Sequence, residues 1–308
     1  MMMNKGIEYK LTGDAQRARI NGWHCNLPPL HLGKGAKHID VKMLKKADRA
    51  NVKMLSNGDY DSRFAIGFEI EKNAFHRGAV VEQELILGYE TDSSCGYEAV
   101  THILPLLPSC KWRSKIYNMM HCARRIIEDE YSPSNGDCGG HITISVEGKT
   151  GYDVQEAIRK NCGIVYALFR HRLTNGYCRN DIFMDAEDVQ GLYTNNPRKY
   201  RVTKVFDDRL EFRLPSRFQS VKQMMRRYEL MYEILDYSFN RPNGSHAHFL
   251  KKITPIIVSM YEGDMDKVNM IMSLAKSFRT MLVTKKINAD VKRWVNPNDD
   301  VYLTDYHI

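Results

Sequence analysis

The sequence predicts an α+β fold, in which a curved, mostly antiparallel sheet with flanking helices is followed by a helical C-terminal region. Two observations favour this class. Between about residues 63 and 216, short β-rich runs alternate with stretches of helical periodicity, and beyond Ser220 the pattern is helical almost throughout. Strands with crossing helices, followed by a helical tail, are typical of α+β proteins.

Five segments are expected to form strands. Phe64–Lys72 alternates apolar and polar residues, as a half-buried strand does, and Gln83–Glu90 does so less regularly. Gly139–Gly148 is an apolar run entered through glycines. Lys199–Phe206 and Arg209–Pro215 read as two strands joined by a tight turn at Asp207-Asp208, with Pro215 ending the second.

The remaining periodic segments predict helices at residues 114–131, 152–173, 221–239, 245–261 and 264–283. Residues 1–62 hold several glycines, two adjacent prolines and no clear period, so we expect an irregular N-terminal cap. The predicted organisation is therefore this cap, an α+β core at 63–218, and a helical region at 219–308 packed on the core.

Composition restricts the class of protein. The chain has 308 residues, of which 43% are hydrophobic and 27% charged, the proportions of an ordinary globular protein. Its net charge of +8 attracts anions, so nucleotide phosphates, nucleic acid and acidic peptides all stay open as ligands. No long Lys/Arg block occurs, so nucleic-acid binding is not favoured as the main role.

Cysteine usage and hydropathy bear on location. The seven cysteines are scattered without a CxxC pair, which indicates reduced thiols. No apolar run approaches the ~20 residues that cross a bilayer, and the first residues lack the apolar stretch of a signal peptide. We expect a cytoplasmic protein without membrane association, in a host cytoplasm if it is virus-encoded.

The first candidate motif is Glu69-x-Glu71. Side chains two apart in a strand share a face, so both carboxylates emerge side by side, and Gly67 before them leaves room for a ligand. Paired carboxylates repel each other unless a cation lies between them, and hard oxygen ligands suit Mg²⁺ or Mn²⁺. The alternative is a solvent-facing strand that carries two ordinary acids.

The second candidate motif is Arg209-x-Glu211-x-Arg213. The three charged residues share one strand face, and the two arginines can grip a phosphate or carboxylate in bidentate fashion. The alternative is a ladder of salt bridges between strands.

The third and fourth candidate motifs are weaker. Cys138-Gly139-Gly140-His141 leads into a strand whose next residue on the same face is Thr143, and the segment Asp92 to Thr101 carries Glu98. Zinc is disfavoured because no second ligand pair has zinc-site spacing. A thiol enzyme with Cys95 or Cys138 as nucleophile and His141 as base lacks an evident third group.

Taken in order, the four motifs resemble the amidoligase family, a branch of the glutamine synthetase and glutamate–cysteine ligase superfamily of carboxylate–amine ligases. Its members share a G-[FYL]-E-x-E strand, an acidic D-x-S segment, a glycine–histidine strand and a late x-E-[FI]-R strand. Here these read Gly67 to Glu71, Asp92 to Thr101, Cys138 to His141, and Leu210 to Arg213. The resemblance covers about residues 63–216 and implies a sheet of the glutamine-synthetase type.

The resemblance also implies roles for individual residues. Five would hold divalent cations, with Asp92 a less certain member: Glu69, Glu71, Glu98, His141 and Glu211. Arg213 would bind the transferred phosphoryl group with Arg209 as a helper, and Lys199 and Arg179 would contact nucleotide or substrate, unless they are only surface charge. The family usually carries a second histidine two residues after the first, where this chain has Thr143, which puts nucleotide contact there in question.

The implied function is an ATP- and Mg²⁺- or Mn²⁺-dependent ligase that joins a carboxylate substrate to an amine substrate through an acyl phosphate. Asp92 or Glu98 would serve as the base that deprotonates the amine. The sequence contains no Walker A, protein-kinase or Gly-x-Ser-x-Gly motif. The alternative is a catalytically decayed ligase-fold protein that acts as a binding or structural module, in association with nucleic acid or an acidic partner.

Overall fold

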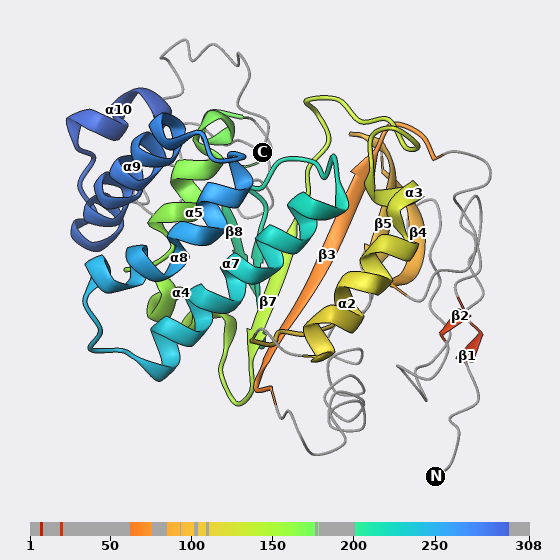
Figure 1. Ribbon diagram of the computed structural model, residues 1–308, viewed down its shortest axis with the longest axis horizontal. Helices are drawn as coiled ribbons and strands as arrows, with labels where there is room; N and C mark the ends of the chain where they lie inside the picture. Colours follow the sequence, from red (N-terminus) through yellow and green to blue (C-terminus); the bar gives the residue numbers. More distant parts are fainter. Residues whose placement is uncertain are drawn as a thin grey trace. The chain divides into compact units, whose positions relative to one another are not determined.

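The computed structural model describes residues 7–8, 19–20, 62–75, 85–92, 94–101, 104–108, 111–175, 178 and 201–295, and these form a mixed α and β structure with an antiparallel sheet (Figure 1). Contacts divide the chain into two units. The first contains the described residues up to Glu147 together with Arg217–Tyr228, and the second contains Gly148–Ser216 and the residues from Glu229 onward. No helix among the described residues is both long enough and apolar enough to cross a bilayer.

The sheet of the first unit is built around β3 (Phe64–Lys72), which has the bounds that its alternating pattern predicts. β5 (Gly96–Thr101) pairs with one edge of β3 and β4 (Ile86–Asp92) pairs with β5, while β7 (Ile142–Val146) and the short β6 (Leu104–Pro105) also pair with β3; all these pairs are antiparallel. A separate two-stranded ribbon joins β1 (Ile7–Glu8) to β2 (Arg19–Ile20).

The two faces of β3 have different environments. Phe64, Ile66, Phe68 and Ile70 are at most 4% exposed, whereas the alternate residues Ala65, Gly67 and Glu69 are half-buried. Two helices, α2 (Lys111–Cys122) and α3 (Arg124–Ile127), lie over the sheet and bury their own apolar residues (Figure 1). Burial of the apolar residues leaves Gly67 and Glu69 on the less covered face.

The end of β3 is held by a buried lysine. Lys72 has no exposed surface, and its Nζ lies 2.7 Å from Asp129 Oδ1 and 2.7 Å from the carbonyl oxygen of Phe218. Burial lowers the pKa of Lys72 despite the adjacent Asp129. Burial alone would raise the pKa of Asp129, but the hydrogen bonds from Lys72 and Ser134 outweigh it, so this pKa lies below its ordinary value.

The predicted helix at 114–131 is wrong as one continuous element. α2 ends at Cys122, α3 is a single turn, and Glu128 at its end is extended (φ −83°, ψ 137°). The following residue is Asp129, whose carboxylate binds Lys72. The chain therefore leaves the helix where this buried ion pair requires it to.

The second unit contains the predicted hairpin. β8 (Thr203–Val205) and β9 (Leu210–Phe212) are antiparallel, and a hydrogen bond of 2.9 Å from Phe206 N to Arg209 O closes the turn around the two aspartates. Both strands are shorter than predicted. α4 (Gly151–Ile158) begins beside this turn, where Gly151 N donates to Phe206 O at 3.1 Å.

The predicted helix at 152–173 is divided into α4, α5 (Gly163–Leu168) and a 3-10 turn at Arg170–Arg172. Helix α5 packs closely on α9 (Met265–Thr284). A Cβ atom at Gly163 would lie 2.5 Å from the Ala275 carbonyl oxygen and 2.7 Å from Arg279 N. This backbone-to-backbone packing sets the direction of α5 independently of α4.

The C-terminal helices confirm the predicted periodicity. α7 (Val221–Asn240), α8 (His246–Met260) and α9 agree with the expected ranges to within a residue or two. Ser245 and Asp264 cap α8 and α9 by accepting backbone N–H bonds, as short polar residues do at helix starts. A further helix, α10 (Ala289–Val295), was not among the predicted elements.

Candidate functional site

Strand register gathers the predicted acids of the first unit on one face. Glu71 on β3 lies directly opposite Glu98 on β5, and Glu98 in turn pairs with Glu90 on β4. Directly opposed residues share a face of the sheet, so Glu71 and Glu98 are neighbours there. On the other edge of β3, Gly67 is paired with Thr143 of β7, and Glu69 N donates to the carbonyl oxygen of His141 at 3.1 Å.

The centre of this face is a histidine between two carboxylates. His141 Nδ1 lies 2.7 Å from Glu69 Oε2, and its Nε2 lies 3.4 Å from Glu71 Oε1. The side chains of His141 and Glu71 are 7% and 8% exposed, and that of Glu69 is 25% exposed. Each ring nitrogen of His141 therefore faces a carboxylate oxygen.

Two glycines shape the surroundings of these side chains. Gly139 N donates a 2.5 Å hydrogen bond to Glu71 Oε2, and a Cβ at Gly139 would lie 2.9 Å from His141 Nε2. The backbone at Gly139 therefore lies too close to His141 and Glu71 to leave room for a side chain. A Cβ at Gly67 would meet no atom within 4 Å, so the space in front of Gly67 is open.

The donor set of this face fits a hard divalent cation. Carboxylate oxygens with one imidazole nitrogen are ligands that Mg²⁺ and Mn²⁺ accept. Glu69, Glu71 and His141 would supply these ligand atoms, since metal binding requires the carboxylates and the imidazole in their deprotonated forms. Glu98 is half-buried beside them, and the half-buried Thr143 shares the face with Gly67 and His141.

The second candidate motif, Arg209-x-Glu211-x-Arg213, pairs its own charges within the second unit. Arg213 Nη1 lies 2.6 Å from Glu211 Oε1, and both groups are largely buried. Arg209 instead turns toward the hairpin loop: its guanidinium lies 3.7 Å from the Phe206 ring centroid and donates to Asp208 at 3.2 Å. An acid–arginine pair on a strand is thus present, while Arg209 is engaged with the turn.

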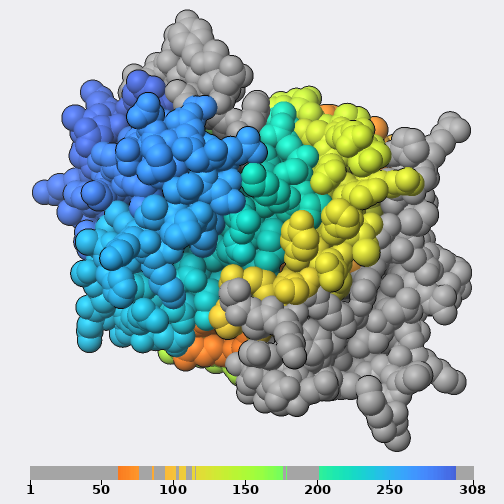
Figure 2. All heavy atoms as spheres, viewed as in Figure 1, coloured from red at the N-terminus to blue at the C-terminus, as the bar shows by residue number. Residues whose placement is uncertain are grey.

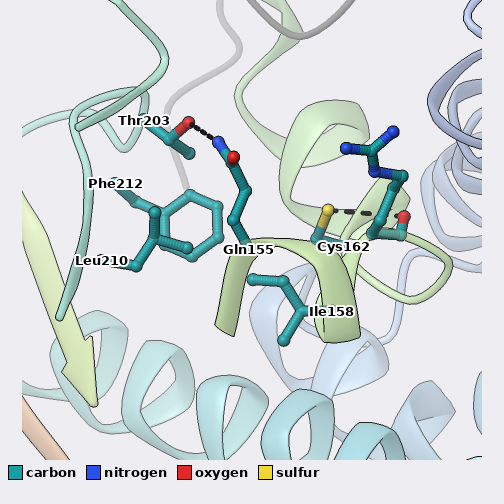
Figure 3. Close-up of a pocket in the computed structure, with 7 residues that line it drawn as sticks. Gln155, Ile158, Cys162, Thr203, Leu210 and Phe212 are labelled. Atoms are coloured by element: carbon teal, nitrogen blue, oxygen red, sulfur yellow. Dashed lines mark hydrogen bonds between the residues drawn. The ribbon is translucent and has the colours of Figure 1, made fainter. Parts of the chain in front are cut away.

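The opposite face of β9 has no room for a substrate. Leu210 and Phe212 contact a cavity that Gln155, Ile158 and Cys162 also line (Figure 3), and its volume is about 10 Å³, enough for one water molecule. Gln155 Nε2 donates to Thr203 Oγ1 across it at 2.9 Å. Leu210 and Phe212 are therefore core residues, which leaves Glu211 of β9 and Arg213 directly after it as the polar pair.

Several predicted residues are only partly described or not at all. Asp92 is the last residue of β4, paired with Gly96, and only its backbone is described. Lys199 and Arg179 lie outside the described residues. Glu90 was missed by the sequence reasoning, although its place in the predicted strand at 83–90 was visible; the signal that could have found it is the pairing of this strand with the segment that carries Glu98.

Two cysteines named as alternative nucleophiles lie next to each other. Cys95 and Cys138 are both buried, and a hydrogen bond from Cys95 lowers the pKa of Cys138. The Cys138 Sγ also contacts Asn135 Oδ1 at 3.6 Å. Each thiol is therefore engaged by neighbouring groups, Cys95 also by the Tyr97 carbonyl oxygen at 3.3 Å.

Comparisons with known proteins assign no family to this chain. The sequence matches no protein-family model, and no curated protein is significantly similar to it. The resemblance to amidoligases therefore depends on the four motifs alone, together with the face of the sheet on which Glu69, Glu71 and His141 meet.

Proposed function

We propose that this protein is an ATP- and Mg²⁺-dependent carboxylate–amine ligase that forms an amide or peptide bond through an acyl phosphate. The observation that supports it best is His141 held between Glu69 and Glu71 on a sheet face that also carries Glu98. These four groups can ligate a metal or move a proton, and they come from β3, from β5 and from the residue that precedes β7. A solvent-facing strand with two ordinary acids does not require such a set.

In this proposal Glu69, Glu71 and His141 hold the divalent cation. The cation supplies charge neutralisation on the phosphate oxygens during phosphoryl transfer. Glu98 is the base that takes the proton from the attacking ammonium, or a further ligand, and Asp92 is the alternative for either role. The open space at Gly67 and the hydroxyl of Thr143 are assigned to the nucleotide.

The proposal carries Glu211 and Arg213 into the same reaction. Glu211 adds a carboxylate to the cation ligands, and Arg213 stabilises the phosphoryl group in transfer, a role worth about 10³–10⁵ in rate in other phosphoryl-transfer enzymes. Arg209 is the weaker candidate because the turn already engages its guanidinium. Lys199 and Arg179 stay as predicted nucleotide or substrate contacts.

The chemistry explains why such a set is needed. A carboxylate is a poor electrophile, because its oxygen leaves badly and its charge repels nucleophiles. Attack of a carboxylate oxygen on the γ-phosphorus releases ADP and gives an acyl phosphate. The amine then attacks the acyl carbon, inorganic phosphate leaves, and the amine proton passes to the base.

Hydroxylamine trapping tests the proposal without knowledge of the natural amine. The full chain is incubated with ATP, Mg²⁺ or Mn²⁺, hydroxylamine, and a panel of amino acids and peptides as carboxylate donors. Formation of a hydroxamate in step with ADP is the expected result. Glu71→Gln and Arg213→Ala should lose it, whereas Glu147→Gln, which changes an exposed acid of the first unit, should retain it.

The departure at Thr143 favours one alternative, a decayed ligase that binds but does not turn over. Calorimetry with Mn²⁺ and a non-hydrolysable ATP analogue separates the two. Binding of both, lost in Glu71→Gln and unaccompanied by hydroxamate or ADP for every carboxylate, would replace the ligase by a binding module. If neither Mn²⁺ nor the ATP analogue binds, both the ligase and the binding module are refuted.

A further inference from the structure

The surface of α2 and α3 has a one-sided charge that the proposed reaction does not use. No aspartate or glutamate occurs between Glu98 and Glu128. Within that run the two helices contain five lysines and arginines: Lys111, Arg113, Lys115, Arg124 and Arg125. Atoms of these helices are seen at the molecular surface in Figure 2, in yellow.

Two of the three acids that directly follow α3 are engaged elsewhere, and the third, Glu130, is exposed. Glu128 accepts a hydrogen bond from Val221 N at 3.4 Å, and Asp129 is engaged by Lys72 and Arg217. Arg124 and Arg125 are exposed, and among the described residues neither forms an ion pair. The Arg125 guanidinium lies 5.8 Å from the Tyr131 ring centroid, and both arginines keep exposed surface.

The one arginine of α2, Arg113, does not belong to this surface. Arg113 donates from Nε and Nη2 to the Leu107 carbonyl oxygen at 3.0 and 2.6 Å, and its guanidinium lies 5.8 Å from the Tyr228 ring centroid. It ties α2 to the core. The exposed charge near the end of the helix pair is thus a separate feature and not a consequence of packing.

Planar side chains lie beside the exposed arginines of α3. Tyr117 is 43% exposed, and its ring stacks on that of His121 with centroids 6.4 Å apart and planes inclined by 21°. Arg124 Nη1 lies 3.4 Å from His121 Nε2. A tyrosine, an imidazole and a guanidinium therefore adjoin one another on the exposed side of α2 and α3.

We infer that this surface, formed by Tyr117, His121, Arg124 and Arg125, binds single-stranded nucleic acid. Arginines neutralise backbone phosphates, and exposed aromatic rings offer stacking to any base, which is how sequence-tolerant single-strand binding works. An acidic peptide would use the charge alone and would leave the exposed tyrosine ring without a role. This inference does not depend on the proposed ligase activity.

Fluorescence anisotropy with labelled oligo(dT) and oligo(U) of about 20 nucleotides tests the inference on the full chain. We expect binding that weakens as salt rises from about 50 to 200 mM, with a log–log slope of about −0.7 per phosphate contact. Arg124→Glu combined with Arg125→Glu should weaken binding at least ~10-fold and flatten the slope by about 1.4, which corresponds to two contacts. The two probes also show whether RNA or DNA is preferred.

Matched variants distinguish a specific nucleic-acid site on α2 and α3 from a general effect of the protein's positive charge. Lys292→Glu with Arg293→Glu makes the same charge change on an exposed pair in α10 and should leave affinity nearly unchanged. Tyr117→Ala should weaken binding about 5- to 100-fold, and Tyr117→Phe should restore it, because stacking needs the ring and not the hydroxyl. Circular dichroism confirms that each variant is folded.

Three results would overturn the inference. The first is no binding of either probe at low salt. The second is equal loss in the α10 control. The third is unchanged affinity in Tyr117→Ala together with competition by polyglutamate as effective as that by oligonucleotide, which would identify an acidic-peptide surface instead. The hydroxamate assay on the same variants is independent of all three.

Discussion

Replacing Lys72 by methionine is expected to lower the free energy of unfolding by about 2–3 kcal/mol. Lys72 is wholly buried and binds both Asp129 and the Phe218 carbonyl oxygen. Methionine fills the volume of the lysine stem, so the cost arises from lost polar contacts and not from a cavity.

The magnitude follows from what each partner retains. The Phe218 carbonyl loses its Lys72 partner in a buried place, which costs about 1–3 kcal/mol. Asp129 keeps Ser134 and Arg217 and has a side chain that is 27% exposed, so its share is at the small end, about 0.5–1 kcal/mol. Asp129→Asn is expected to cost more, about 3–5 kcal/mol, because it leaves a buried ammonium without its counter-charge.

Urea unfolding monitored by circular dichroism measures both variants against wild type. The expected order of loss is Asp129→Asn, then Lys72→Met, then Glu130→Gln as an exposed neighbouring control. A loss below about 1 kcal/mol for Lys72→Met, or the reverse order of the first two, would refute the buried pair as the anchor of β3.

The lowered pKa of Lys72 determines how the free energy of unfolding changes with pH. The folded state releases the Lys72 proton before the unfolded state does, so the unfolded state binds more protons between the lowered pKa and 10.5. The contribution of this group to stability therefore rises with pH across that interval. Comparison of urea midpoints of wild type and Lys72→Met from neutral to alkaline pH should show a difference that grows, and a constant difference would contradict the assignment.

Three further predictions follow from local geometry. Gly67→Val should leave stability unchanged or raised, since its Cβ meets no atom within 4 Å, yet weaken ATP-analogue binding at least ~10-fold in calorimetry; unchanged affinity would place the nucleotide elsewhere. Gly163→Ala should destabilise by about 1–3 kcal/mol in urea unfolding because its Cβ would strike the backbone of α9; a neutral effect would contradict that packing. Burial raises the pKa of Cys162 to about 12, so iodoacetamide at neutral pH should label the exposed Cys122 first in mass spectrometry, and the reverse order would contradict it.

Sequence patterns predicted those helices and strands whose type and bounds do not depend on contacts with distant parts of the chain. The alternation in Phe64–Lys72 predicted the bounds of β3, and the helical period predicted α8 and α9 to within a residue or two. The two aspartates at 207–208 located the hairpin. Local periodicity and turn chemistry suffice for these because each is set by residues close together in the chain.

Prediction failed where distant contacts decide. The long helix expected at 152–173 is divided because Gly163 meets α9, more than 100 residues later. The helix expected at 114–131 ends early at the residue before Asp129, which binds a lysine of β3. The residues within either segment carry no pattern that predicts these long-range contacts.

The sequence by itself determined the residue types of the candidate site and the shared face of Glu69 and Glu71, since strand geometry fixes a period of two. Only the tertiary structure decided that His141 lies between those carboxylates and that Glu98 stands opposite Glu71. The physical reason is strand register: a shift of one residue in the pairing of β3 with β7 would send His141 to the face opposite Glu69 and Glu71, and the same shift with β5 would do so for Glu98.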